Sequence, residues 1–596
     1  MKVKYILKRI SLSIFLVLLT GLFSCKKYLD LKPQSSFDES YVFSTVTTAT
    51  SAVMGVYGHL AGQEGYGSRL STMYTVDQDE SMSYSNTSAG GGDGGQKALA
   101  RYNATSENAI LLPPYNQLYA GIEGANICIK NIPKMDTYIN GSATDQAALK
   151  RLYGEVLTLR AQFFFELIRN WGDVIAPFMP SIDQPDLTLP QTNRDEIYDH
   201  ILADLKTAED LVPWRKEVGG AANERITKGA VKAIRAKIAL FSGGYSLRRS
   251  HTMERRANYL DYYKIARDEC DEIIKSGQHA LNPTFESIFK TYMDAHLMEP
   301  NGEILFEVAM AGGLGATDSR LTTTGPTVGV NANGACRMLP TYYYAFDSLD
   351  TRKDVTVTDY SINSSNFKTA HPTATIGVIY AGKFRQDWVT NPTIDPKVST
   401  LLAGINWPVI RYSDVLLMFA EADNEISGGA SPEAVSAFEA VRKRGFKGNE
   451  AKIGLTPTDK DGFFKAIINE RWLEFGGEGI RKYDLIRWNL LGTKIAEAKA
   501  NLLKIVNKEA PYQNLPTIRY YKTSSTTMVW YNSMYTPEPV LPTPPAGYTK
   551  VNWTTGLSLA YINTVADSFT PNRAELLPFP LAAINANPKI IQNYGY

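Results

Sequence analysis

The feature that most constrains this chain is a run near its C-terminus in which charged residues are interleaved with aromatic and aliphatic ones. It reads Asn469-Glu470-Arg471-Trp472-Leu473-Glu474-Phe475, followed by Glu478-Gly479-Ile480-Arg481 and Tyr483-Asp484-Leu485-Ile486-Arg487-Trp488. The periodicity predicts a helix with Trp472, Leu473 and Phe475 toward a core, a Gly-Gly break and a second amphipathic segment. Because Glu470 and Glu474 lie one turn apart and like charges repel at that spacing, both need basic partners.

Three arginines of the same run, Arg471, Arg481 and Arg487, are the obvious partners. Unpaired charges do not stay buried, so the composition of the run favours a structural network of ion pairs that includes Glu478 as well. The alternative is a carboxylate pair that performs acid–base chemistry.

The first 24 residues have the pattern of a secretory signal. Lys2, Lys4, Lys8 and Arg9 precede an apolar run from Ile10 to Leu19 that is too short for a membrane span. The run ends in Leu22-Phe23-Ser24-Cys25, which resembles a lipobox, in which the cysteine is diacylated and becomes the mature N-terminus. Since two or three acyl chains anchor a protein stably, lipidation at Cys25 predicts a membrane-anchored protein.

Charge and cysteine usage exclude several classes of protein. Removal of residues 1–24 takes four basic and no acidic residues from a net charge of +1, which leaves −3. A nucleic-acid or anionic-membrane partner needs a basic excess, so neither is predicted. Once Cys25 carries lipid, Cys128, Cys270 and Cys336 remain, and this odd number implies no disulfide scaffold.

Helical patterns recur in pairs along much of the chain. The pairs are 46–60 with 116–132, 145–170 with 195–212, 228–242 with 262–276, and 411–426 with 432–444. Ser142 with Asp145 and Thr192 with Asp195 have capping-box spacing at two of the starts, and Ala230, Ala233, Ala236 and Ala239 form a stripe that permits close packing. Such pairing fits a mostly helical, tetratricopeptide-like scaffold, although no clean 34-residue repeat is visible.

Long stretches of different character interrupt the helices. Residues 77–89 lead into the run Gly90-Gly91-Gly92-Asp93-Gly94-Gly95, residues 306–408 are rich in Gly, Thr, Pro and aromatics with a short strand at 304–310, and residues 512–564 form another insertion. We therefore divide the chain into a signal peptide (1–24), a lipidated tether (25–36), an N-terminal helical-repeat region (37–300), a loop-rich ligand-binding lobe (301–408) and a C-terminal region that completes the scaffold (409–596).

Signatures of enzymes and metal sites are missing from the sequence. The histidines lack zinc-ligand spacing, and neither a G-x-S-x-G elbow nor a G-x-x-x-x-G-K-[ST] loop occurs. Asp77, Asp79 and Glu80 lack the spacing of an EF-hand, and we interpret them as a solvated acidic loop. No catalytic residue, cofactor or metal site is predicted.

The aromatic residues are suited to carbohydrate. Sugar rings stack their CH faces on Trp and Tyr, while their hydroxyls need polar side chains nearby. Three loops offer this mixture, and their candidate residues are Tyr74, Asp77, Tyr84 and Asn86 in the first, Arg337, Tyr342, Tyr343 and Tyr344 in the second, and Arg385, Asp387 and Trp388 in the third. Trp388 offers the largest face, but each of these aromatics is also explained by packing in a core or a loop.

Several motifs together resemble the SusD/RagB family, the surface glycan- and nutrient-binding lipoproteins of Bacteroidetes-type outer membranes. Beside the run at 469–488, residues 411–422 (RYSDVLLMFAEA) are similar to the family's RYAEVLLMYAEA helix. Leu577-Pro578-Phe579-Pro580, Asn587-Pro588 and Gln592-Asn593-Tyr594-Gly595-Tyr596 are similar to its C-terminal close, with Tyr594 where proline is common. Upstream, residues 119–126, 160–173 and 225–240 also fit.

The resemblance implies a SusD-like fold and a non-enzymatic function, in which no covalent bond of the ligand is broken. It implies a cell-surface, outer-membrane lipoprotein that captures an oligosaccharide and delivers it to a SusC-like TonB-dependent transporter. The alternatives are a RagB-like lipoprotein that takes up peptides, a glycoside hydrolase with two convergent carboxylates in a cleft, or a repeat scaffold without a small ligand.

Overall fold

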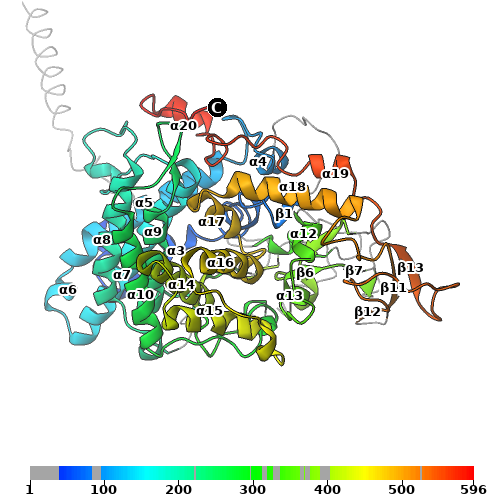
Figure 1. Ribbon diagram of the computed structural model, residues 1–596. Helices are drawn as coiled ribbons and strands as arrows, with labels where there is room; N and C mark the ends of the chain where they lie inside the picture. The colour runs from blue at the N-terminus through cyan, green and yellow to red at the C-terminus, as the bar shows by residue number, and fades with distance from the viewer. Residues whose placement is uncertain are drawn as a thin grey trace, which may run out of the picture.

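Figure 1 shows the computed structural model of the protein, with long helices in one half and short strands and loops in the other. The structure describes residues 39–83, 95–219, 223–294, 297–311, 319–326, 336–362, 368–369, 376–389, 403–523 and 527–596. The expected signal peptide, Cys25 and the tether lie outside the described residues. Within them, no helix is both long enough and apolar enough to cross a lipid bilayer.

The long helices pack one against the next. They are α3 (Val46–Gly58), α5 (Leu112–Asn131), α7 (Ala143–Trp171), α8 (Arg194–Leu211), α9 (Lys228–Gly243), α10 (Tyr259–Lys275), α14 (Tyr412–Ser427), α15 (Pro432–Gly445) and α16 (Lys460–Phe475). Helix α3 packs on α5 and α7, each helix from α7 to α10 contacts the next, and α10 contacts α14, which carries α15 and α16. The expected helices are confirmed, with their ends shifted by a few residues.

Small residues let these helices approach closely. Ala230, Ala233, Ala236 and Ala239 of α9 are completely buried, as the stripe predicts. On α5, a Cβ at Gly121 would lie 2.5 Å from the ring of Phe163 on α7, so a larger residue there would force the two helices apart.

The two predicted helix caps have different outcomes. The Ser142 hydroxyl accepts a hydrogen bond from the amide of Asp145 at 3.2 Å, which caps α7 as expected. The cap of α8 is Asn193, whose side chain accepts from the amide of Asp195 at 2.9 Å, and the prediction of Thr192 was wrong. The Thr192 amide donates instead to the carbonyl of Val174, which holds residue 192 in an extended bridge outside the helix.

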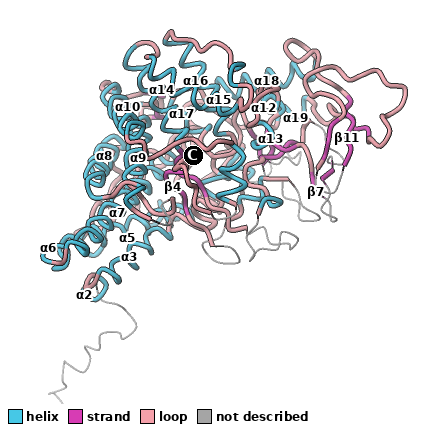
Figure 2. The backbone as a smooth tube through the Cα atoms, turned by 90° about the horizontal axis from the view of Figure 1, so that it is seen from below, coloured by secondary structure: helices cyan, strands magenta, loops and turns pink. Residues whose placement is uncertain are grey.

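The other half contains small antiparallel sheets. Their strands are β1 (Ser81–Ser83), β5 (Cys336–Met338), β9 (Ile379–Ala381) and β6 (Val357–Thr358) in that order; β12 (Met528–Trp530), β11 (Ile518–Thr523) and β13 (Thr549–Asn552); and the pairs β10 (Trp407–Arg411) with β4 (Ile304–Val308), β2 (Ser246–Leu247) with β3 (Met253–Glu254), and β7 (Ser361–Ile362) with β8 (Lys368–Thr369). Figure 2 shows β7 and β11 at the end of the molecule opposite α6 (Asp136–Asn140) and α8. Strand β4 confirms the strand expected at 304–310.

This loop-rich half is assembled from distant parts of the chain. The sheet of β5, β9 and β6 belongs to the predicted lobe at 301–408, but its edge strand β1 comes from residues 81–83.

Short helices connect the longer elements. They include α2 (Glu39–Val42), α4 (Gln96–Ala100), α11 (Phe285–Ser287), α12 (Pro340–Tyr343), α13 (Lys353–Thr356), α19 (Leu559–Asn563) and α20 (Leu581–Ala586).

The predicted Gly-Gly break follows α16. Gly477 and Gly479 have φ angles of 79° and 69°, a region that glycine enters without the steric cost that other residues bear. The turn leads into α17 (Arg481–Arg487), and α18 (Leu491–Asn507) comes next. The second segment is thus confirmed as a helix, but it is not amphipathic in the structure, because all seven residues of α17 are buried.

The acidic residues of the opening motif lie in a buried network of ion pairs. The Glu474 carboxylate accepts hydrogen bonds from Arg444 at 2.5 Å, Arg411 at 3.0 Å and Arg352 at 3.2 Å. Burial alone would raise the pKa of Glu474, but the three guanidinium groups outweigh burial and hold this pKa well below its usual value. Glu474 is therefore a buried, ionised centre of the fold.

The partners in this network differ from those expected. Glu470 accepts from Arg352 at 2.6 Å, and Glu478 accepts from Arg411 and from Lys383. Each of these bases lies outside the run itself. The expected arginines pair with other acids: Arg471 with Asp414 and Asp484, Arg481 with Asp79, and Arg487 with Asp484 and Glu421.

Helix geometry explains part of the error. Arg471 follows Glu470 by one residue, about 100° around α16, so these two side chains do not face each other. Arg471 is also held by Asp414 and Asp484, which lie on other segments.

The three described cysteines, Cys128, Cys270 and Cys336, are free and buried.

We predict that Glu474→Ala lowers the free energy of unfolding by about 3–5 kcal/mol, because it leaves three buried guanidinium groups without their shared carboxylate. Chemical denaturation at neutral pH measures this quantity. The matched control is Glu286→Ala, which removes a half-exposed ion pair with Lys290. A surface pair is worth about 0–1 kcal/mol, so equal losses in the two variants would contradict a central role for Glu474.

A second prediction concerns Glu307 on β4, a buried side chain whose Oε2 has no hydrogen-bond partner. Burial, with Glu224 nearby, raises the pKa of Glu307 to about 8. Because the folded protein binds this proton more tightly than the unfolded chain does, Glu307 costs stability as the pH rises from its ordinary pKa toward 8. Relative to wild type, Glu307→Gln should gain melting temperature between about pH 5 and pH 8, and a pH-independent difference would refute this.

Candidate ligand-binding site

Six of the candidate residues from the sequence are buried, and four of them, three tyrosines and an aspartate, are at most 2% exposed. Tyr74 and Tyr342 are completely buried, and their hydroxyls donate to the carbonyls of Ile110 and Trp472. Tyr343 is 2% exposed and donates to Asp359. A sugar ring needs a free aromatic face, and these three tyrosines offer none in this structure; they are packing residues, as the alternative interpretation held.

Asp77 is the fourth of these buried candidates. The interpretation of residues 77–80 as a solvated acidic loop was wrong. Asp77 accepts from the amides of Ser83 and Ala566, and burial raises its pKa to about 7. Asp79 and Glu80 are also buried.

Within the described part of the chain, no group of three or more His, Cys, Asp or Glu side chains is arranged to hold a metal ion.

Arg385, Asp387 and Trp388 form one cluster, as their spacing suggests, but protein groups already occupy it. Trp388 is 7% exposed, and Arg385 and Lys290 lie 4.0 and 5.6 Å from its ring centre. Arg385 donates to backbone carbonyls and to the Tyr360 hydroxyl, and Asp387 pairs with Lys368 at 3.5 Å. Trp388 is therefore a cation–π packing residue here, and Asp387 is the member of the cluster that reaches the surface.

For the other candidate residues, a role in ligand binding stays a prediction. Arg337 is half-buried on β5, between β1 and β9. Tyr84 and Asn86 lie outside the described residues, and Tyr344 is half-buried with its hydroxyl accepting from Trp553.

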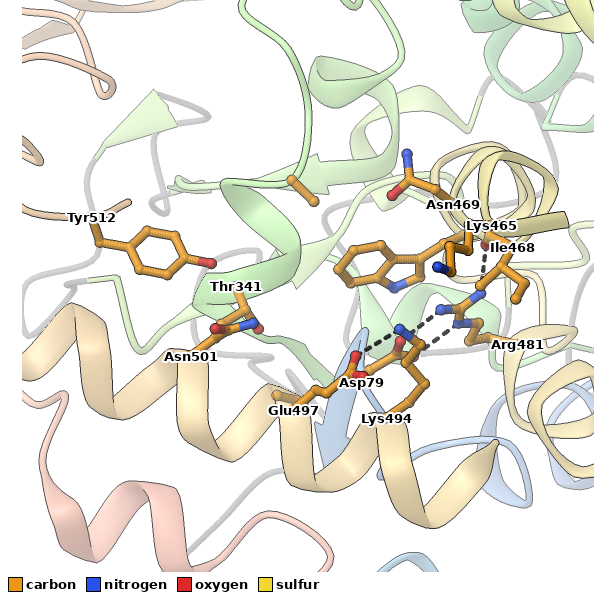
Figure 3. Close-up of a pocket in the computed structure, with 13 residues that line it drawn as sticks. Asp79, Thr341, Lys465, Ile468, Asn469, Arg481, Lys494, Glu497, Asn501 and Tyr512 are labelled. Atoms are coloured by element: carbon orange, nitrogen blue, oxygen red, sulfur yellow. Dashed lines mark hydrogen bonds and ion pairs between the residues drawn. The ribbon is translucent and has the colours of Figure 1, made fainter. Parts of the chain in front are cut away.

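A cavity of about 510 Å³ lies where α16, α18 and α12 meet (Figure 3). This volume is within the range of about 300–1,000 Å³ that small-ligand pockets have. The lining residues are Asp79, Thr341, Ala345, Lys465, Ile468, Asn469, Trp472, Arg481, Lys494, Glu497, Ala498, Asn501 and Tyr512.

Two helices supply the polar walls through residues at helical spacing. On α16, Lys465, Asn469 and Trp472 follow one another at intervals of four and three, so they share one face of the helix. On α18, Lys494, Glu497 and Asn501 have the corresponding spacing, and Figure 3 shows these three side chains along one side of that helix. Tyr512, from the loop after α18, stands at the far end of the cavity in the same view.

The floor of the cavity is an ion pair between distant parts of the chain. Arg481 donates to both carboxylate oxygens of Asp79, at 2.9 and 2.6 Å, and to the carbonyl of Ile468 at 2.8 Å. Both charged residues are nearly inaccessible to solvent. This bidentate pair fixes the turn after α16 against the segment before β1.

Trp472 is the aromatic wall. It is half-buried, with its ring centre 5.2 Å from that of Tyr342 and Arg481 lying over it at 5.3 Å. Its indole Nε1–H is buried without a hydrogen-bond partner, and so is the hydroxyl of Thr341. A buried polar group without a partner is costly, and neither atom is open to the cavity in this structure, so the cavity meets Trp472 through its ring.

The sequence placed Trp472 toward the core, and Trp472 does pack against the core beside Tyr342, but it also lines the cavity, which the sequence did not predict. Trp472 lies in an apolar pattern next to Leu473, but its own face of α16 also carries Lys465 and Asn469, a mixture that a core helix face does not have. The signal that finds this site is a pair of polar stripes at intervals of three and four on two neighbouring helices, one with a tryptophan.

The chemistry of the cavity is that of binding. Its two carboxylates are engaged in ion pairs, Asp79 with Arg481 and Glu497 with Lys494 at 2.6 Å. Both carboxylates thus have ion-pair partners within the protein. An aromatic wall, amide groups and hydroxyls are instead the groups that hold a polar, ring-shaped ligand.

Comparison with known protein families gives two matches. Residues 315–596 match the model of the SusD family, and residues 27–240 match a model described as starch-binding and associating with the outer membrane. Among curated proteins, SusD-like protein P25 of Formosa agariphila is 25% identical over 521 residues, which cover 80% of this chain and 89% of the relative. SusD-like protein P2 of the same organism is 24% identical over 495 residues.

Solved structures have the same fold. A SusD homologue from Bacteroides thetaiotaomicron superposes with a TM-score of 0.73 at 21% identity, over 93% of this chain and 97% of the homologue. A laminarin-binding SusD-like protein has a TM-score of 0.63 at 19% identity, over 93% of this chain and 100% of that protein. Surface glycan-binding protein A of Bacteroides thetaiotaomicron, solved with laminarihexaose, has a TM-score of 0.61 at 19% identity, over 92% and 100% of the two chains.

Proposed function

The chain belongs to the SusD family, and we propose that it is a surface lipoprotein of the outer membrane that binds an oligosaccharide and delivers it to a SusC-like TonB-dependent transporter. Membership of this family makes it a binding protein and not an enzyme. The sugar binds in the cavity between α16 and α18.

The observation that carries this proposal is the half-buried ring of Trp472 in the wall of a cavity that two asparagine amides also line. The indole face packs against the CH groups of a sugar ring. Asn469 and Asn501 each offer a donor and an acceptor to the sugar hydroxyls from opposite walls.

The comparisons support a glycan over other ligands. Two of the similar structures are of proteins described as binding laminarin or as glycan-binding, and one of these was solved with a hexasaccharide. A peptide would need backbone partners along an extended cleft, whereas the polar groups of this cavity are side chains around an aromatic wall. Membership of the SusD family speaks against a glycoside hydrolase.

We predict that Trp472→Ala weakens oligosaccharide binding about ten- to hundredfold, because a buried stacking aromatic contributes roughly 1–3 kcal/mol. Trp472→Phe keeps an aromatic face but a smaller one, so its affinity should lie between those of wild type and the alanine variant. Calorimetry against a panel of neutral and acidic oligosaccharides measures the affinities.

The matched control is Trp214→Ala, since Trp214 is another half-buried tryptophan and lies outside the cavity, in the segment between α8 and α9. It should leave the affinity unchanged. If some oligosaccharide binds and Trp472→Ala keeps wild-type affinity while remaining folded, the site lies elsewhere. If no member of the panel binds to wild type, the carbohydrate function itself is rejected.

Anchoring is tested separately. We predict that Cys25→Ser abolishes acylation and releases the protein from membranes into the soluble fraction, because the lipid supplies the anchor. Fractionation and mass spectrometry of the mature N-terminus measure both effects. An unmodified Cys25 in native, membrane-derived protein would contradict the lipid anchor.

A further inference from the structure

The charges that line the cavity do not balance. Asp79 with Arg481 and Glu497 with Lys494 are two neutral pairs. Lys465 is the fifth charged residue of the lining, it is exposed, and within the described chain its ammonium has no ion-pair partner. The cavity therefore carries one uncompensated positive charge on the α16 wall.

The hydrogen-bonding capacity left open in the cavity is also unbalanced. The Lys465 ammonium has three N–H groups and no acceptor, and the Lys494 ammonium has N–H groups beyond the one that pairs with Glu497. The two asparagine amides serve either role, both oxygens of Asp79 accept from Arg481, and one oxygen of Glu497 pairs with Lys494. A ligand that satisfies this surface must supply more acceptors than donors.

Helix geometry places the unpaired cation beside the aromatic wall. Lys465 precedes Asn469 by one turn and Trp472 by two, so the three residues share one face of α16. A sugar ring stacked on Trp472 has the ammonium of Lys465 within two helical turns, about 11 Å along the axis, which is the scale of one or two sugar units. A substituent on the same or the neighbouring unit then meets the ammonium.

We propose that this cavity selects an oligosaccharide that carries an anionic group, either a uronate carboxylate or a sulfate ester, and that Lys465 recognises this group. The inference rests on the function proposed above and specifies the chemical class of its ligand. A carboxylate or sulfate provides the surplus acceptors and cancels the remaining charge, whereas a neutral glucan does neither.

The test measures the affinity of the full chain for three hexasaccharides of matched length: a neutral glucan, a polyuronate and a sulfated glucan. Each is titrated at low and at high salt. We expect one anionic ligand to bind at least about threefold more tightly than the neutral one at low salt, and this preference to shrink at high salt because solvent-exposed charges are screened. The anionic ligand that binds most tightly shows whether the recognised group is the carboxylate or the sulfate.

Lys465→Gln should remove most of the preference and its salt dependence, and Lys465→Glu should reverse it. Both substitutions lie on an exposed position without a partner, so the melting temperature should not change. The matched control is Lys150→Gln, which removes an exposed lysine of α7 that lies outside the cavity lining. It should preserve the preference.

The outcomes separate this inference from the proposed function. Equal affinities for neutral and anionic ligands, with sensitivity to Trp472→Ala, would overturn the anionic preference and leave glycan binding in the cavity standing. A preference that survives Lys465→Gln would overturn the role of Lys465. Binding of no hexasaccharide, or binding insensitive to Trp472→Ala, would reject the site and this inference with it.

Discussion

The architecture depends on a buried carboxylate shared by three arginines. Glu474 of α16 binds Arg444 from α15, Arg411 from the junction of β10 with α14, and Arg352 from the loop-rich half. Each charge in this cluster would be costly if it were buried alone, so the cluster forms only when all four segments are in place. The Glu474 cluster therefore ties the loop-rich half to the helical array and fixes the orientation of α16.

The cavity takes its shape from that orientation. At about 100° per residue, Glu470 and Glu474 lie on the side of α16 opposite the face that carries Lys465, Asn469 and Trp472. One side of the helix thus lies in the buried ion-pair network, while the other side forms a wall of the cavity. Beyond its end, the two glycines with positive φ turn the chain so that Arg481 reaches Asp79 beneath the same wall.

Much of the helical half could be predicted from the sequence because its information is local. The spacing of apolar residues, the Ser142 cap and the alanine stripe of α9 act within a few turns of one helix. The site could not be predicted in this way. Tyr74, Tyr342 and Trp388 are aromatic residues suited to a sugar platform, yet residues remote in sequence pack against their rings.

The sequence by itself determined that this chain is mostly helical, which residues form most of its long helices, where α16 breaks, and, through its motifs, which family it resembles. Local spacing and the backbone limits of glycine suffice for the first three. Only the tertiary structure decided which charges pair and which aromatic faces stay open. Asp77, Asp79 and Glu80 appear solvated in sequence, but they are buried against residues 566, 481 and 477, and such long-range contacts leave no local pattern.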